Sequence, residues 1–336
     1  MQRIGKYTLQ LDPPAYILGS GAYVGKKEGE GPLAGYFDAV HDDGRVGQDS
    51  WEKGESKMQT EAVKTALRKA GVEPQAVQAV FAGDLLNQCI SSAFGLRELG
   101  IPYLGQYGAC STMAQGMGLA AAFVSAGAAE NAVAVTSSHF CTAERQYRFP
   151  LEYGGQRTPT AQWTATGAGA VLLGRNAGPV SVRDVAFGRM ADLGVTDLNN
   201  MGAAMAPAAV QTLADYFTDT GAKPADFDLI LTGDLGEVGS GLLRELLGRA
   251  GWDVETNHND CGLMLYRREE QDVHAGGSGC GCSASVVCGY LLKKMREGAL
   301  RDVLFVGTGA LMSPTSSQQG ETIPGIAHLV RLHAEQ

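Results

Sequence analysis

Hydrophobic residues occur in short continuous runs that end in glycine or polar residues. The clearest runs cover 76–81, 132–135, 166–173, 227–231 and 303–306. Runs of this length bounded by turn residues are typical of buried strands in an α/β sheet. Within residues 1–50, apolar runs such as 15–18 alternate with glycine-rich stretches at 19–21 and 29–32, which predict loops.

Residues 50–71 instead show helical spacing. Apolar positions recur at 58, 62, 63, 66 and 67, with Ser50 at the start as an N-cap and Gly71 as a stop. The pattern predicts an amphipathic surface helix.

The stretch 103–129 carries no charged residue. Its length raises a membrane span as an alternative. Because its apolar positions are mostly alanine and it holds several glycines and glutamines, a helix covered by protein on all sides is the better interpretation.

The second half of the chain repeats the first. The run 227–231 leads into Gly233-Asp234-Leu235 as 79–81 leads into Gly83-Asp84-Leu85. The stretch 279–309 likewise repeats 110–138, with Val133 matching Leu304. A repeat this long predicts two similar α/β halves, 1–177 and 178–336, in a layered α/β/α/β/α arrangement with the uncharged helices between sheets.

Composition narrows the function. The 336 residues are 44% hydrophobic and carry a net charge of -9, with no basic cluster, which argues against nucleic-acid binding. Seven scattered cysteines and no signal peptide favour a reduced compartment. The Cys280-Gly281-Cys282 motif lacks a second ligand pair, so no metal or other cofactor is expected.

Candidate chemistry centres on Cys110, which follows a small-residue elbow at the start of the uncharged helix. A helix N-terminus favours a thiolate, so Cys110 is a candidate nucleophile or anion contact. The alternative is a buried cysteine that only packs.

Polar groups after the predicted strands are further candidates. Asp84 and Asn87 follow the strand at 76–81, and His139 follows 132–135. Asp84 and Asn87 could instead cap the turn that follows their strand, and His139 could be a structural residue. The nearest cationic candidates are Arg145, Arg148 and Arg157. The alternative for each arginine is a solvated charge on the surface.

These features resemble the thiolase and ketoacyl-synthase superfamily. More narrowly, the motifs GDLLNQ (83–88), YGACST (107–112), DCGLMLY (260–266) and GGSGCGCSA (276–284) are similar to those of the stage V sporulation protein AD family of spore-forming Bacillota. The resemblance covers the whole chain. It implies a thiolase fold that binds dipicolinic acid (pyridine-2,6-dicarboxylate) for uptake into the developing spore. It also implies attachment to the spore inner membrane through other stage V sporulation A membrane proteins, since no transmembrane or lipidation signal is seen, and a homodimer.

The superfamily's acid-base residues are not matched. Its histidine position falls near Gly233, and Cys280 stands roughly where an asparagine would. We therefore expect a non-catalytic binding protein, with backbone donors at the Cys110 helix start and a 307–309 loop. The expected ligand-binding residues are Cys110, Asp84, Asn87, His139, Gly233, Asp234, Cys280 and Gly309.

Three alternatives stay open. The loop 258–261 could bring His258 as a replacement catalytic histidine, which would make the chain an active acyltransferase using Cys110. The chain could instead be a purely structural partner of a membrane complex. Finally, Asp84 and Asp234 would repel a dianion unless turned aside, hydrogen-bonded or bridged by calcium.

Overall fold

Within the part of the chain that the structure describes, twelve strands form one continuous mixed sheet with two similar halves, and β7 and β12 pair in a separate two-stranded sheet. The computed structural model describes residues 1–147 and 157–335. The main strand order is β5-β4-β6-β8-β2-β9-β14-β13-β10-β11. The first-half strands are β2 (Thr8–Gly25), β4 (Ala79–Gly83), β5 (Tyr103–Gly105), β6 (Asn131–Ser138) and β8 (Gly167–Gly174). The second-half strands are β9 (Val180–Phe187), β10 (Leu229–Thr232), β11 (His258–Asp260), β13 (Asp302–Ala310) and β14 (Gly325–Ala334). The small strands are β1 (Gln2–Ile4), β3 (Ala39–His41), β7 (Trp163–Thr164) and β12 (Gly277–Ser278).

The predicted repeat is visible in the strand pairing. β4 pairs parallel with β5 and β6, and β8 pairs antiparallel with β6 and β2. β10 pairs in the same way with β11 and β13, and β14 with β13 and β9. Val133 lies opposite Val80, as Leu304 lies opposite Ile230. The two half-sheets are joined by the pairing of β2 with β9. The division of the chain into domains at 177/178 stays a prediction.

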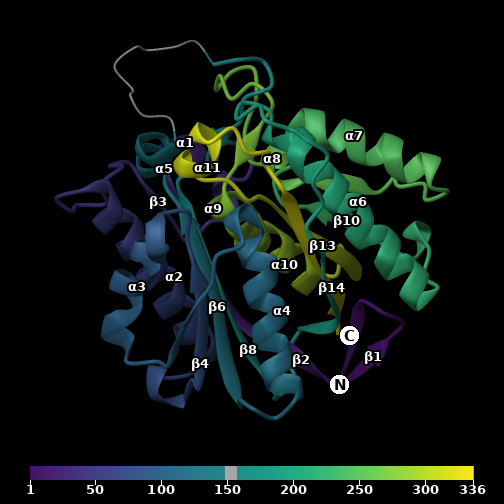
Figure 1. Ribbon diagram of the computed structural model, residues 1–336. Helices are drawn as coiled ribbons and strands as arrows, with labels where there is room; N and C mark the ends of the chain where they lie inside the picture. The colour runs from purple at the N-terminus through teal and green to yellow at the C-terminus, as the bar shows by residue number, and fades with distance from the viewer. Residues whose placement is uncertain (148–156, 336) are drawn as a thin grey trace.

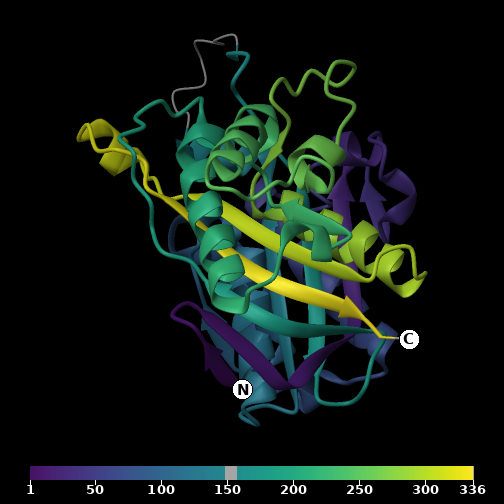
Figure 2. The same ribbon diagram turned by 90° about the vertical axis from the view of Figure 1, so that its right-hand side faces the viewer.

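Helices lie outside and between the half-sheets. The first-half helices are α1 (Lys26–Gly29), α2 (Trp51–Ala70), α3 (Ile90–Leu96), α4 (Thr112–Ser125) and α5 (Phe140–Tyr147). The second-half helices are α6 (Met201–Thr220), α7 (Gly236–Arg249), α8 (Cys261–Met264), α9 (Cys280–Ser285), α10 (Leu292–Arg296) and α11 (Pro314–Gln318). A π-helical segment, 286–291, joins α9 to α10. Figures 1 and 2 show α2 and α3 outside one half and α6 and α7 outside the other.

The uncharged helix is covered by protein, as its composition predicts. α4 contacts β4, β6 and β8 of the first half, β13 and β14 of the second, and also α9. Most of its residues are buried. This position between the half-sheets explains why α4 tolerates no charge. Among the described residues, no helix combines the length and the hydrophobicity that a bilayer crossing requires.

The predicted helix at 50–71 is confirmed, and it explains one wrong loop prediction. Ser50 caps α2 by accepting from the Lys53 amide, and Gly71 ends it in the left-handed conformation with φ 65°. Residues 19–21 do not form a loop but continue β2. A Cβ at Gly21 would lie 2.3 Å from the carbonyl oxygen of Ala62 in α2. The glycines at 19–21 are therefore needed for close packing of helix on strand.

The expected loop at 307–309 is also wrong. β13 continues through these residues to Ala310 and pairs with β14 throughout. A Cβ at Gly309 would lie 2.5 Å from the carbonyl oxygen of Gly108. The glycine is therefore needed to let the strand approach the elbow before Cys110.

Candidate functional site

The elbow that carries Cys110 is a tight turn fixed by its own polar groups. Residues 109–111 form a turn of 3-10 helix directly before α4, with Ala109 at a left-handed φ of 49°. The Ser111 hydroxyl donates to the Gly108 carbonyl at 2.7 Å, and the Thr112 hydroxyl donates to the Ala109 carbonyl at 2.7 Å. Left-handed geometry in a non-glycine residue is strained and is concentrated at functional sites.

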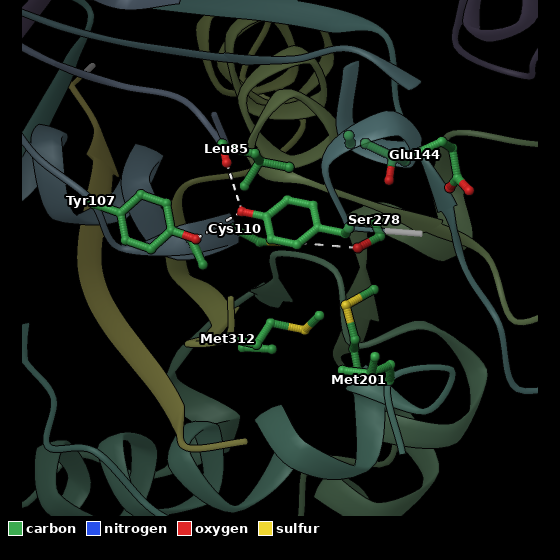
Figure 3. A pocket seen from close by; sticks show the side chains of 13 residues that line it. Leu85, Tyr107, Cys110, Glu144, Met201, Ser278 and Met312 are labelled. Carbon is green, nitrogen blue, oxygen red and sulfur yellow. Dashed lines mark hydrogen bonds between the residues drawn. The ribbon is translucent and has the colours of Figure 1, made fainter. Parts of the chain in front are cut away.

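Cys110 lies in the wall of a small cavity of about 60 Å³. A water needs about 10–15 Å³ by the same measure, so this space is equivalent to roughly four to six waters. Figure 3 shows Met201 and Met312 on one side of the cavity and Leu85 on the other. The lining residues are Leu85, Tyr107, Ala109, Cys110, Ala143, Glu144, Tyr147, Thr164, Leu198, Met201, Ser278, Ala310 and Met312.

Burial of Cys110 opposes the thiolate that a helix N-terminus favours. Its side chain is buried, and the Ser278 hydroxyl lies 4.0 Å from its sulfur. Burial raises the pKa of the Cys110 thiol well above its usual value, and the neighbouring Asp234 carboxylate raises it further. In a buried site with an acid close by, desolvation outweighs the helix N-terminus.

Asp234 joins the second half of the chain to this cavity. Its carboxylate accepts from the Ser278 hydroxyl at 3.1 Å, the Gly279 amide at 2.9 Å and the Thr308 hydroxyl at 2.9 Å. Burial raises the pKa of the Asp234 carboxyl, and these hydrogen bonds oppose that shift. Asp234 is not itself among the lining residues but positions Ser278, which is.

Cys280 packs beside the cavity rather than lining it. It belongs to one apolar cluster with Cys110, Leu85 and Ala143. Its thiol donates to the Ser137 carbonyl at 2.8 Å. Gly233 and Gly309 also contribute no lining atoms; a Cβ at Gly233 would lie 3.0 Å from the Thr308 amide nitrogen.

Asp84 is buried away from the cavity and is turned into its own loop. Its carboxylate accepts from the Leu86 amide at 2.9 Å and from both the amide and the hydroxyl of Ser92, at 2.8 and 2.6 Å. Behind it lies Glu55, whose buried carboxyl accepts from the hydroxyls of Ser137 and Thr142. Burial, reinforced by Asp84, raises the pKa of Glu55 to about 8. The amphipathic pattern of α2 predicts no buried acid at position 55.

The remaining polar candidates lie outside the cavity. Asn87 lines a neighbouring hollow, and its backbone N–H donates to the side-chain oxygen of Gln146 at 3.0 Å. His139 is buried, with Nε2 2.6 Å from the Gly44 carbonyl and Nδ1 accepting from the Cys141 amide. His258 lies 3.0 Å from the Thr232 hydroxyl, and burial lowers its pKa to about 4.

The cationic candidates are paired elsewhere. Arg145 forms an ion pair with Glu52, and Arg157 pairs with Asp272 at 3.0 Å. Arg148 lies outside the described residues. Among the residues that the structure describes, those lining the cavity include no arginine, lysine or histidine. Searched over the same residues, the chain has no cluster of three or more acidic, histidine or cysteine side chains suited to a metal ion.

Sequence reasoning missed four large side chains of the cavity. Tyr107, Tyr147, Met201 and Met312 all line it. Tyr107 precedes the elbow directly and was open to prediction from that position. The other three come from separate elements, and only the fold brings them together.

The arrangement defines the class of protein. Its fold is that of 3-oxoacyl-[acyl-carrier-protein] synthase III from Aquifex aeolicus, with a TM-score of 0.56 and 15% identity over 95% of this chain and 99% of that one. The Xanthomonas campestris OleA structure with bound acetamide is similar with a TM-score of 0.62 and 14% identity, over 95% of this chain and 98% of that one. The chain is thus a thiolase-like α/β protein.

Within that class, the family is specific. The profile of the family described as Stage V sporulation protein AD (SpoVAD) matches residues 5–333. The chain is 45% identical to Stage V sporulation protein AD of Bacillus subtilis (strain 168), covering 98% of this chain and 97% of that protein. The chain belongs to the stage V sporulation protein AD family.

Proposed function

We propose that this chain binds dipicolinic acid in the Cys110 cavity, without converting it, and so serves uptake of that molecule into the developing spore. The single observation that carries the proposal is the small, largely apolar cavity at Cys110 in a chain of a sporulation family. Small-molecule sites are typically concave and apolar with a few polar groups that fix orientation.

The chemistry of the lining suits a flat ring better than an extended acyl chain. The space is small, and its walls combine two tyrosine rings with the thioethers of Met201 and Met312. Sulfur and aromatic groups both make favourable contacts with an aromatic ring. Thr164 and Ser278 add polar residues to the wall, and the Ser278 hydroxyl, which donates to Asp234, can still accept a hydrogen bond from a ligand.

Charge sets a condition on the bound species. Dipicolinate is a dianion at neutral pH, and burying it in a cavity whose described lining has no cation would cost several kcal/mol. Glu144 adds an acidic group to the same wall. A calcium chelate of dipicolinate is neutral. Our proposal therefore favours the ligand with its own calcium over the free dianion.

The absence of turnover rests on proton handling. Condensing chemistry needs a thiolate and a positioned acid or base, which contributes roughly a hundredfold to ten-thousandfold in rate. Burial raises the pKa of the Cys110 thiol, which disfavours the thiolate, and His258 pairs with Thr232 instead. The rival function, acyl transfer by Cys110, predicts a covalent acyl-thioester mass on that residue after incubation with an acyl thioester.

Titration calorimetry with dipicolinate, with and without calcium, tests the proposal. We expect saturable binding that calcium strengthens, and no product in a parallel chromatographic assay. A protein with no affinity under either condition would instead be a structural partner of a membrane complex, and the proposal would fail.

Two further assignments belong to the same proposal. We place the chain on the spore inner membrane, held by other stage V sporulation A membrane proteins, and test this by fractionating spores that lack them. We also propose a homodimer through the free edge of β5, where Tyr103 and Leu104 are about 40% exposed. Leu104→Lys should shift the protein to monomer in sedimentation velocity; an unchanged mass would reject that interface.

A further inference from the structure

The Cys110 cavity has two neighbouring hollows that share part of its wall. One lies along the loop after β4 and is lined by residues including Leu86, Asn87 and Cys89. The other lies toward α11 and is lined by residues including Leu198 and Pro314. Tyr147 and Met312 line all three spaces. These two side chains therefore lie where the inner cavity adjoins both outer hollows.

Hydrogen bonds hold Tyr147 in the closed position. Its hydroxyl donates to the Leu85 carbonyl at 2.6 Å and lies 3.1 Å from the Tyr107 hydroxyl. The side-chain amide of Gln146 donates to the same Leu85 carbonyl at 2.9 Å. The end of α5 is thus tied to one carbonyl group of the loop after β4.

That loop is strained next to the tie. Gln88 and Cys89 are consecutive non-glycine residues with left-handed φ values of 57° and 50°. Such a backbone conformation is strained in a non-glycine residue and persists only when its surroundings hold it. The two strained residues, Gln88 and Cys89, themselves line the outer hollow along this loop.

We propose that Tyr147, backed by Met312, determines the size of molecule that reaches Cys110. Its ring closes the inner cavity, and its hydrogen bond to Leu85 must break before a ligand can pass from either outer hollow. This inference deepens the proposed function, and only its ligand-binding part rests on it. Access to Cys110 itself can be measured without any ligand.

Alkylation of Cys110 provides that measurement. The intact protein is treated at one pH with iodoacetamide, or with the bulkier N-phenylmaleimide, and each cysteine is followed by peptide mass mapping. Tyr147→Phe keeps the ring but loses the tie, so Cys110 should react about fivefold faster with iodoacetamide. Tyr147→Ala should in addition admit the maleimide, which the native protein excludes.

Matched controls separate gating from loss of stability. Tyr107→Phe leaves the Tyr147–Leu85 hydrogen bond in place and should change the rate less than Tyr147→Phe. Cys288 is buried and does not line the cavity, so it reports global opening. Equal acceleration at Cys288 and Cys110, or an unchanged Cys110 rate in both Tyr147 variants, would overturn the inference.

Dipicolinate with calcium then distinguishes the two proposals. If Tyr147 controls access, Tyr147→Phe should raise association and dissociation rates by a similar factor and leave the dissociation constant nearly unchanged. A dissociation constant that changes while both rates scale differently would make Tyr147 a binding contact and contradict the gate. If neither the native protein nor the Tyr147 variants bind dipicolinate, but the Cys110 alkylation rates rise in the variants as predicted, the gate stands and the proposed function fails.

Discussion

The two halves of the chain repeat one topology but use their equivalent residues differently. Asp84 accepts from Leu86 and Ser92, which closely follow it in sequence, whereas Asp234 accepts from Ser278, Gly279 and Thr308, which are distant in sequence within the same half. Cys110 lines a cavity, whereas the thiol of Cys280 is occupied by the Ser137 carbonyl. Duplication therefore supplied two helix starts, and of the cysteines at those two starts it is Cys110 that lines the cavity.

The largest expected difference concerns the two aspartates. Asp234→Ala and Asp84→Ala each leave three buried donors without an acceptor, so each should lower the free energy of unfolding by about 3 kcal/mol or more. Chemical denaturation measures this. The milder Asp234→Asn should weaken dipicolinate binding, while Asp84→Asn should not. Equal loss of affinity in both would show that the halves are not specialised as we describe.

The pH dependence of stability sharpens the comparison, because each half buries a second acid. Burial raises the pKa of Glu55 to about 8, and that of Asp260 to about 7. A carboxyl with a raised pKa in the folded state binds more protons than in the unfolded state. Stability should therefore fall as pH rises from about 4.5 to 8.

Isosteric amides test which half is responsible. Glu55→Gln should flatten the pH profile of denaturation midpoints up to about pH 8, and Asp260→Asn up to about pH 7. Profiles that keep the wild-type slope would mean that neither acid is held protonated by its burial.

A smaller effect is expected from the two cysteines. Cys110→Ala removes a contact from the cavity wall and should weaken dipicolinate binding about fivefold, equivalent to about 1 kcal/mol. Cys280→Ala should lower stability through its lost hydrogen bond and leave affinity nearly unchanged. Calorimetry and thermal unfolding on both variants check this. The reverse pattern would place the ligand beside Cys280.

The smallest expected effect compares glycines in the outer helices. A Cβ at Gly241 of α7 would meet no atom within 4 Å, so Gly241→Ala should stabilise the protein by about 0.5–1 kcal/mol. A Cβ at Gly54 of α2 would lie 2.7 Å from the Arg45 carbonyl oxygen, so Gly54→Ala should destabilise it. Denaturant titration gives both values; two changes of the same sign would contradict this packing difference.

Much of the fold was predictable because its signals are local or repeated. The cap at Ser50, the stop at Gly71 and the uncharged α4 each follow from a few neighbouring residues. The glycines at 19–21 and 307–309 misled because glycine is used both for turns and for close packing. Only the helix or elbow on the opposing side distinguishes the two uses.

The site was less predictable for a physical reason. Cys110 could be located from its elbow, but its protonation depends on burial and on Asp234, far away in sequence. His139 and Asn87 follow their strands as expected, yet their hydrogen bonds point to Gly44 and Gln146. Met201, Met312 and Tyr147 converge on the cavity only through tertiary packing.

Calorimetric stoichiometry tests the central claim most directly. Titrating the protein with dipicolinate in the presence of calcium should give one binding site per chain, and Cys110→Ala should weaken that site. Two equivalent sites per chain, or binding that Cys110→Ala leaves untouched, would contradict a single receptor site at the Cys110 cavity.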